Sequence, residues 1–232
     1  SANRNLYIGS KNVLSGYTKL YEYEGNYTNL KADSCFIRDH KTFNIQKHAD
    51  QCSFYYDKNS PLIAVIGSSH SLAMFPTIEK FVEKHSYNSF WLSRGNCPFP
   101  EQGLNAQLGC QKIMQESEDY LVNKFNNNNS GGILIISNNL SSYFGYKGEF
   151  RKTFLANNKG KKDDVDKNLE NYVKALERLS FKLKNSNTKI IVISPIPEFI
   201  GLEPILCKDE WFRPIGSISK GCKSINKSKE IE

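Results

Sequence analysis

Short runs of mostly apolar, β-prone residues recur along much of the chain and are separated by segments with helical spacing. The runs cover residues 62–66, 89–92, 133–136 and 189–193. The run at 62–66 is continuous, which is typical of a strand that is buried on both faces of a parallel sheet. Between them, apolar residues recur every three or four positions, which predicts helices over residues 70–84, 112–125 and 164–184.

The alternation of strands and helices predicts the fold class. Strands joined by helical crossovers form a parallel sheet with helices on both faces, so we expect an α/β protein with three α/β/α layers. Residues 1–60 show no helical period and are predicted to be an N-terminal lead-in that wraps onto a core of residues 61–232. The sequence contains neither an internal repeat nor a linker, so the core is predicted to be one domain.

Composition and charge narrow the classes of protein without selecting one. The 232 residues carry a net charge of +7, which would suit nucleic acid, anionic glycans or a membrane surface. Because the sequence has no zinc-finger spacing, RNP-like segment or arginine-rich helix, we expect no nucleic-acid partner. No apolar run approaches the roughly 18 residues that cross a bilayer. The chain starts at Ser1 without a methionine, and we expect any export signal or membrane anchor to lie outside it.

The six cysteines fall into three separated couples: Cys35 and Cys52, Cys97 and Cys110, and Cys207 and Cys222. Six cysteines allow fifteen pairing schemes, of which pairing within each couple is the simplest. Each such bridge would close a loop-like stretch and stabilise the fold by about 3 kcal/mol. Three disulfides would indicate an oxidising compartment, and six reduced thiols in the cytosol are the alternative. The sequence has no Cys-x-x-Cys, so no metal site is expected.

Small polar residues follow the first three strands, at the sheet edge where α/β proteins bind ligands. Ser69 comes after a buried strand and before a helix, where backbone N–H groups favour the charge of a nucleophile and its oxyanion. Gly95 offers a backbone N–H, and Asn138 or Asn139 a side-chain N–H, to the same oxygen. Serine is also a favoured helix cap, and glycine and asparagine are favoured in turns, so purely structural roles are the alternative.

An ordered series of segments resembles one enzyme family. Segment 63–71, with the sequence IAVIGSSHS, looks like the first block of SGNH hydrolases. More narrowly, it is similar to the Gly-Asp-Ser-His-Ala form of SGNH domains fused to membrane acyltransferase-3 proteins. Segments 94–99, 136–144 and 193–214 resemble later parts of that subfamily, and Cys35 with Cys52 resembles its upstream cysteine pair. Each block alone is unspecific, but their order over about residues 33 to 222 is specific.

The resemblance implies roles for several residues in a flavodoxin-like SGNH fold. Ser69 would be the nucleophile, and Gly95 and Asn138 would complete the oxyanion hole with the Ser69 amide. Ser68 stands where the family usually has aspartate, and we expect Ser68 and His70 to support the site from behind. The family's late Asp-x-x-His block, which supplies the catalytic histidine, is absent from the sequence. We expect it to fall downstream of Glu232.

None of the four histidines of the chain is a convincing replacement for that base. His70 is adjacent to Ser69, and neighbouring side chains at a helix start diverge by about 100°. His85 is predicted near the far end of the first helix, and His40 and His48 lie in the predicted Cys35–Cys52 loop. The catalytic triad is therefore predicted to be incomplete in this chain.

The resemblance implies an extracytoplasmic O-acyltransferase domain that needs no metal or bound cofactor. A membrane acyltransferase-3 partner, in the same parent protein, would deliver an acyl group, expected to be acetyl. Ser69 would carry it as an ester to a hydroxyl of a cell-surface polysaccharide. A carbohydrate or lipid esterase with the same serine is the first alternative. A non-catalytic glycan-binding or scaffold domain is the second, and it is favoured by Ser68 and the absent Asp-x-x-His.

Overall fold

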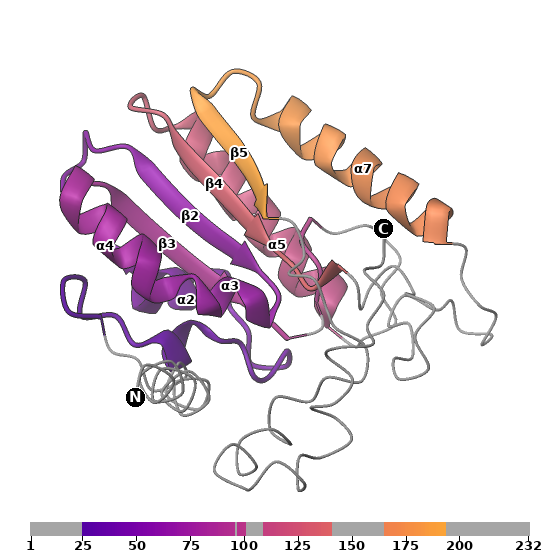
Figure 1. Ribbon diagram of the computed structural model, residues 1–232, viewed down its shortest axis with the longest axis horizontal. Coiled ribbons are helices and arrows are strands. Elements are labelled where there is room, and N and C mark those ends of the chain that lie inside the picture. Colours follow the sequence, from indigo (N-terminus) through magenta and orange to yellow (C-terminus); the bar gives the residue numbers. More distant parts are fainter. Residues whose placement is uncertain (1–24, 96, 101–108, 141–164, 194–232) are drawn as a thin grey trace, which may run out of the picture. The chain divides into compact units, whose positions relative to one another are not determined.

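The computed structural model describes residues 25–95, 97–100, 109–140 and 165–193. All of them belong to one of two compact units, Tyr23–Pro195. These residues form a five-stranded sheet in the order β1-β3-β2-β4-β5 (Figure 1). The strands are β1 (Ser53–Phe54), β2 (Leu62–Gly67), β3 (Asn88–Ser93), β4 (Gly132–Ser137) and β5 (Thr188–Ile193).

The sheet is parallel apart from its first strand. β2 pairs in parallel with both β3 and β4, and β4 pairs in parallel with β5, whereas β1 pairs with β3 in the antiparallel direction. Each of the four apolar runs in the sequence is a strand, and the predicted α/β fold with a mainly parallel sheet is confirmed.

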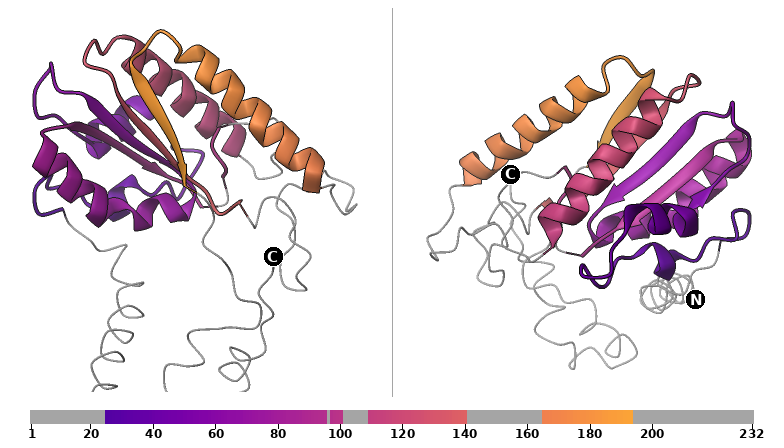
Figure 2. Two further views of the ribbon diagram at one scale, coloured as in Figure 1. Left: turned by 45° about the horizontal axis from the view of Figure 1, so that its top comes forward. Right: turned by 180° about the vertical axis from the view of Figure 1, so that it is seen from behind.

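Helices cover both faces of this sheet. In Figure 1 and the rear view of Figure 2, α3 (Ser69–Ala73) and α4 (Phe75–His85) lie on one face, and α2 (Ile45–Cys52) and α5 (Cys110–Asn126) on the other. α7 (Val165–Lys182) lies beside α5. The helix predicted over residues 70–84 is two helices, because Pro76 starts α4 anew after Met74.

Side chains of the central strands alternate between the two helical layers, which builds a core on each face. On the α3–α4 face, the rings of Phe75 and Trp91 stack with centroids 4.3 Å apart. On the α5 face, the strands, α5 and α7 share one cluster of buried residues: Ala64, Ile66, Phe90, Leu92, Ile113, Leu121, Phe125, Leu134, Ile136 and Leu179. Both faces of the middle strands are therefore buried, as the continuous apolar runs predict.

The segment before β2 contains a helix that the sequence did not predict. The Asn44 side chain caps α2 by accepting a hydrogen bond from the Lys47 N–H at 2.9 Å. α2 and the residues around Cys35 cover the edge of β3 beyond β1, where the Ile37 N–H donates to the Ser93 carbonyl at 2.7 Å. These residues thus complete the sheet edge, and the predicted division of the chain at residue 60 stays a prediction.

Two of the three predicted disulfides are present. Cys35–Cys52 joins the residues that cover the β3 edge to the end of α2, with the Cα atoms 5.5 Å apart. Cys97–Cys110 joins the segment after β3 to the start of α5, with the Cα atoms 5.4 Å apart. The predicted Cys207–Cys222 bridge lies outside the described residues.

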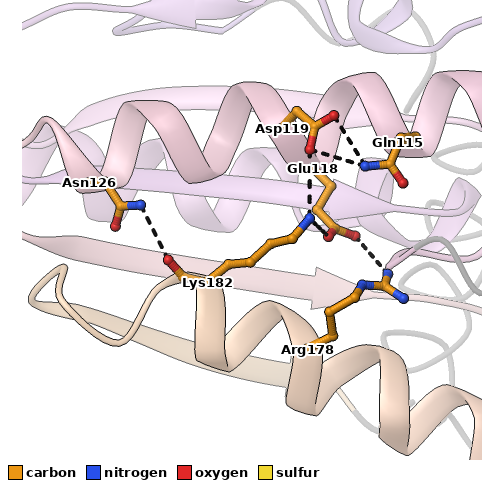
Figure 3. A network of polar contacts seen from close by, with 6 residues as sticks. All are labelled: Gln115, Glu118, Asp119, Asn126, Arg178 and Lys182. Atoms are coloured by element: carbon orange, nitrogen blue, oxygen red, sulfur yellow. Dashed lines mark hydrogen bonds and ion pairs between the residues drawn. The ribbon is translucent and has the colours of Figure 1, made fainter.

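A buried carboxylate holds α7 against α5 (Figure 3). The Glu118 side chain of α5 has no solvent exposure and accepts hydrogen bonds from Arg178 at 3.1 Å and from Lys182 at 2.8 Å. Lys182 also pairs with Asp119 at 3.7 Å. Removing the cations from a buried carboxylate leaves an uncompensated charge, so this network fixes the position of α7 along α5.

We expect loss of the two cations, Arg178 and Lys182, to destabilise the fold more than loss of the Glu118 charge. The double variant Arg178→Gln/Lys182→Gln leaves Glu118 ionised and unpaired, and should lower the free energy of unfolding by about 3–5 kcal/mol. Glu118→Gln removes the buried charge and should cost less. Lys174→Gln, which breaks an exposed pair with Glu170, is the matched control and should cost under about 1 kcal/mol. Urea denaturation measures all three, and a double variant as stable as Lys174→Gln would contradict the prediction.

Candidate functional site

The three strands that carry the predicted site residues end side by side. Gly67, the last residue of β2, is paired with Ser93 at the end of β3 and with Ser137 at the end of β4. Ser69, Gly95 and Asn138 follow these ends by one or two residues. The parallel register therefore brings all three segments to the carboxyl edge of the sheet.

The junction between β2 and α3 is packed against the end of β4. Gly67 has a φ of +151°, and a Cβ at this position would collide with the Ser137 carbonyl oxygen. The next residue, Ser68, is buried, and its N–H donates to the same carbonyl at 3.1 Å. Only glycine allows the two strands to come this close before the chain turns into α3.

Ser68 ties the ends of all three strands together. Its hydroxyl accepts a hydrogen bond from the Asn139 N–H at 2.9 Å, beyond the end of β4. Its carbonyl accepts from the Ser93 hydroxyl at 2.8 Å and from the Ser71 hydroxyl at 2.7 Å. Ser68 stands at the position where the family that the sequence resembles usually has aspartate. Its hydroxyl accepts the hydrogen bond from Asn139 at this position.

Ser69 is the first residue of α3 and is half-buried. Among the described residues, none forms a hydrogen bond with its hydroxyl or its N–H. An N–H at the first position of a helix has no partner within that helix. α3 has only five residues, so the local N–H groups, rather than a long helix dipole, are what this position offers to an oxyanion.

Gly95 lies in a turn that is held from two sides. A Cβ on Gly95 would lie 3.3 Å from the Phe36 ring, which packs against it. The Arg94 side chain donates to the carbonyls of Ile37 and Arg38, both at 2.7 Å, and its backbone N–H donates to the Gly67 carbonyl at 3.0 Å. No described residue accepts a hydrogen bond from the Gly95 N–H.

The Asn138 side chain is buried and hydrogen-bonded on the side of the sheet that faces α7. Its Oδ1 accepts from the Phe99 N–H at 3.2 Å, and its Nδ2 donates to the Phe99 carbonyl at 2.7 Å and to the Tyr172 hydroxyl at 3.2 Å. Burial raises the pKa of Tyr172 to about 12, against a smaller lowering by the Asn138 hydrogen bond. Both N–H groups of the Asn138 amide are thus used within the protein.

Asn139, the alternative, is placed differently. It is half-buried, and its backbone N–H donates to Ser68, the residue before Ser69. The parallel register brings Ser69, Gly95 and both asparagines to the same edge, and the Asn138 side chain is the one that contacts Phe99 and Tyr172.

Two of the four histidines occupy structural positions. His48 is buried between Phe43 and Phe90, and its Nε2 donates to the Trp91 carbonyl at 2.9 Å. Burial lowers the pKa of His48, and the hydrogen bond to Trp91 opposes this. His85 lies at the end of α4 against Phe81.

The other two histidines are nearer the sheet edge. His40 packs on Gly109, next to α5, and its Nδ1 is 3.9 Å from Asp39. The Lys41 N–H, and also the charge of His40, lower the pKa of Asp39, which is an exposed carboxylate. His70 follows Ser69 in α3 and is half-buried.

The described residues contain neither a metal cluster nor a membrane-spanning helix. No group of three or more His, Cys, Asp or Glu side chains among them is arranged to hold a metal ion. None of the described helices is both long enough and apolar enough to cross a membrane.

Comparison with known proteins gives one family. A family model described as "SGNH domain (fused to AT3 domains)" matches residues 34–221. No curated protein matches the chain. One solved structure, described as "Structure of Salmonella ser. Paratyphi A lipopolysaccharide acetyltransferase periplasmic domain", is similar at 16% identity with a TM-score of 0.46. The match covers 81% of this chain but only 59% of that one, so this chain spans less than two thirds of its length.

We expect Asn138 and Asn139 to differ sharply in their effect on stability. Asn138→Ala leaves the buried N–H and carbonyl of Phe99 without partners and should lower the free energy of unfolding by about 2–3 kcal/mol. Asn139→Ala, at a half-buried position, should cost less than about 1 kcal/mol. Urea denaturation and hydrogen exchange of the Phe99 amide measure the difference. Equal losses in the two variants would show that Asn138 does not hold the Phe99 segment.

We expect His48 to destabilise the fold on acidification. A histidine whose pKa is lowered in the folded state binds its proton more tightly when unfolded, so stability is lost as the pH falls below about 6.5. His48→Gln, which can still donate to Trp91, should flatten the dependence of unfolding free energy on pH between 7 and 5. His85→Gln, at an exposed position, is the control and should keep the slope of the parent chain. A parent chain with no slope in this range would refute the assignment.

Proposed function

We propose, from the premise that this chain belongs to the family of SGNH domains that are fused to AT3 domains, that it is an extracytoplasmic acyl-transfer domain with Ser69 as its nucleophile. Membership in this family supports serine-dependent acyl-transfer or esterase-type chemistry. The observation that carries the proposal is the shared sheet edge. There, Ser69 and Gly95 follow the ends of strands that the register aligns and Ser68 joins, and no described residue accepts a hydrogen bond from the N–H of either.

The reaction we propose has two acyl-transfer steps. A general base takes the Ser69 proton, Oγ attacks the carbonyl carbon of an acyl donor, and the donor's leaving group departs with a proton. An ester on Ser69 remains. A hydroxyl of a polysaccharide then attacks this ester with the help of the same base, and Ser69 regains its proton. Transfer to water in the second step would make the domain an esterase, and the same edge would serve both reactions.

The oxyanion in both steps would be bound by the N–H groups of Ser69 and Gly95 and by the side chain of Asn139. We place Asn139 in this role because Phe99 and Tyr172 occupy both N–H groups of Asn138. Asn138 then acts indirectly, by holding the segment that carries Asn139. A donor of this kind contributes a factor of about 10²–10³ to the rate.

The general base is the part of the site that the four histidines do not supply. His48 is committed to Trp91, His85 lies at the far end of α4, and the ring of His70 diverges from Ser69. His40 lies in the Cys35–Cys52 loop, where it packs on Gly109 and has its Nδ1 3.9 Å from the exposed Asp39, and we assign it to that surface pair. We therefore propose that the base comes from an Asp-x-x-His segment beyond the 232 residues, in keeping with the family pattern.

The acyl donor and compartment follow from the family description. Fusion to AT3 domains supports a membrane acyltransferase-3 partner in the same parent protein, and acetyl is the acyl group we propose. The closed Cys35–Cys52 and Cys97–Cys110 bridges support an oxidising location such as the periplasm or outer cell face. A cell-surface polysaccharide is the acceptor we propose. With Ser68 in place of aspartate and no Asp-x-x-His in the chain, a non-catalytic glycan-binding domain is the second candidate.

We expect the 232-residue chain alone to hydrolyse p-nitrophenyl acetate only slowly. Without a general base, the rate should be about 10²–10⁴-fold below that of a protein extended through an Asp-x-x-His. A fluorophosphonate probe should label Ser69 in the extended protein, with Ser69→Ala unlabelled and Ser130→Ala, an exposed serine, labelled normally. Adding an oligosaccharide acceptor should divert acetyl from water to sugar.

The outcomes separate the candidates. Asn139→Ala should slow labelling without loss of stability, whereas the effect of Asn138→Ala should follow its stability. An extended protein that no serine probe labels would favour the non-catalytic domain. Fast turnover by the 232-residue chain would contradict the missing base, and loss of that turnover in His40→Ala would identify His40 as its source.

A further inference from the structure

Two adjacent tyrosines stand in solvent at the other end of the sheet from Ser69. Tyr55 and Tyr56 are 61% and 54% exposed. They follow β1, which runs antiparallel and pairs Phe54 with Ser89 at the start of β3. Their loop therefore lies at the amino edge of the parallel strands, away from the carboxyl edge where Ser69 lies. Because two adjacent aromatic side chains are exposed here, the contacts that fix the conformation of their loop are of interest.

The loop that carries these rings is fixed by one buried side chain, Asn88, which is 6% exposed. Its Oδ1 accepts from the N–H groups of Tyr56 at 2.7 Å and Asp57 at 3.3 Å. Its Nδ2 donates to the carbonyls of Asp57 at 2.7 Å and Ser60 at 3.0 Å. Both acceptor positions and both N–H groups of this amide are hydrogen-bonded to the backbone of residues 56–60. The loop that carries the tyrosines is therefore rigid.

Tyr55 is also oriented by α5. The Lys124 ammonium lies 5.8 Å from the centre of the Tyr55 ring and 5.4 Å from that of Tyr120. Tyr120 packs on Phe90 in the core, with ring centres 5.2 Å apart, and its hydroxyl is hydrogen-bonded to that of Tyr55. Burial first, and then the neighbouring Tyr55, raise the pKa of Tyr120. We call Tyr55, Tyr120 and Lys124, together with the adjacent exposed Tyr56, the tyrosine surface.

The surroundings of the tyrosine surface are polar: Asp57 and Lys58, which follow the tyrosines, are exposed and charged, and the segment after α5 is polar and uncharged. Residues 126–130 are four asparagines and a serine. The Ser130 hydroxyl donates to the Asn59 carbonyl, and the Asn128 side chain contacts the Ser60 carbonyl at 3.5 Å, so this segment is joined to the tyrosine loop. Asn59, Asn127 and Ser130 are exposed. The rings are thus bordered by amides and hydroxyls.

This combination fits a saccharide better than a lipid. The ring faces can stack on the C–H faces of a sugar, and amides and hydroxyls can bind its hydroxyl groups. Segments 55–60 and 126–130 contain no aliphatic residue, whereas binding to a membrane surface relies on larger apolar anchors. Tyrosine side chains on a rigid loop lose little conformational entropy on binding, which helps them to bind a ligand that makes few contacts.

We propose that the tyrosine surface is a polysaccharide-binding site separate from the edge that carries Ser69. A strand of six residues spans about 20 Å, so a polymer of several sugar units reaches both edges. A second contact of this kind raises the effective concentration of acceptor hydroxyls near Ser69. The link to acyl transfer rests on the proposed function, but saccharide binding itself does not.

The experiment is an NMR titration of the 232-residue chain with maltohexaose, chitohexaose and hexagalacturonate. At least one of them should shift the signals of Tyr55, Tyr56 and neighbouring amides in a saturable way. Tyr55→Ala and Tyr56→Ala should each weaken binding about fivefold to tenfold, and Tyr55→Phe should keep most of it. Phe181→Ala removes another exposed ring, 68% exposed on α7, and should leave the affinity unchanged.

Three results would overturn the proposal. The first is no saturable shift with any of the three hexasaccharides. The second is an equal loss of affinity in Phe181→Ala. The third is binding to phosphatidylglycerol vesicles that the tyrosine variants abolish, with no binding of sugar. Ser69→Ala should bind sugar normally, so failure of Ser69 to react would count against the proposed function without affecting this site. The chemical-shift changes of the unmutated chain test the proposal even if a variant fails to fold.

Discussion

The close approach of β2 and β4 at Gly67 is the constraint on which the site depends. A side chain at this position would collide with the Ser137 carbonyl, so the absence of a Cβ lets the two strands stay paired to their last residues. Ser68 then reaches both neighbours, through Ser93 on one side and Asn139 on the other. Ser69 begins α3 at a position already fixed by these bonds, before any ligand is present.

The sequence predicts the sheet well because its signal is strong and local. The runs at 62–66 and 133–136 are continuous and apolar, and each is a strand that the structure extends by one residue or two. α2 was missed because its buried face has only Ile45, Ala49, Cys52 and a histidine, too little to show a helical period. Asn44 was the one available signal, since asparagine is a favoured helix cap.

Side-chain direction at the end of a strand is harder to predict. The apolar run of β4 does not fix the residue at which the strand ends, and a shift of one residue exchanges Asn138 with Asn139. Only the contacts of Asn138 with Phe99 and Tyr172 show which of the two faces inward. The burial of Glu118 is equally hard to predict, because its sequence context is that of an exposed glutamate on a helix. Its partners, Arg178 and Lys182, lie some sixty residues later in the chain.

The Cys97–Cys110 bridge has a consequence for how such a domain can diversify. It joins the segment after β3 to the start of α5 with the Cα atoms 5.4 Å apart, so the chain between the two cysteines leaves and returns at nearly one point. Insertions or exchanges within a loop closed in this way do not displace its ends. Descendants of this sequence can therefore exchange residues between Phe99, which holds the Asn138 amide, and Gly109, while Gly95 and α5 keep their places.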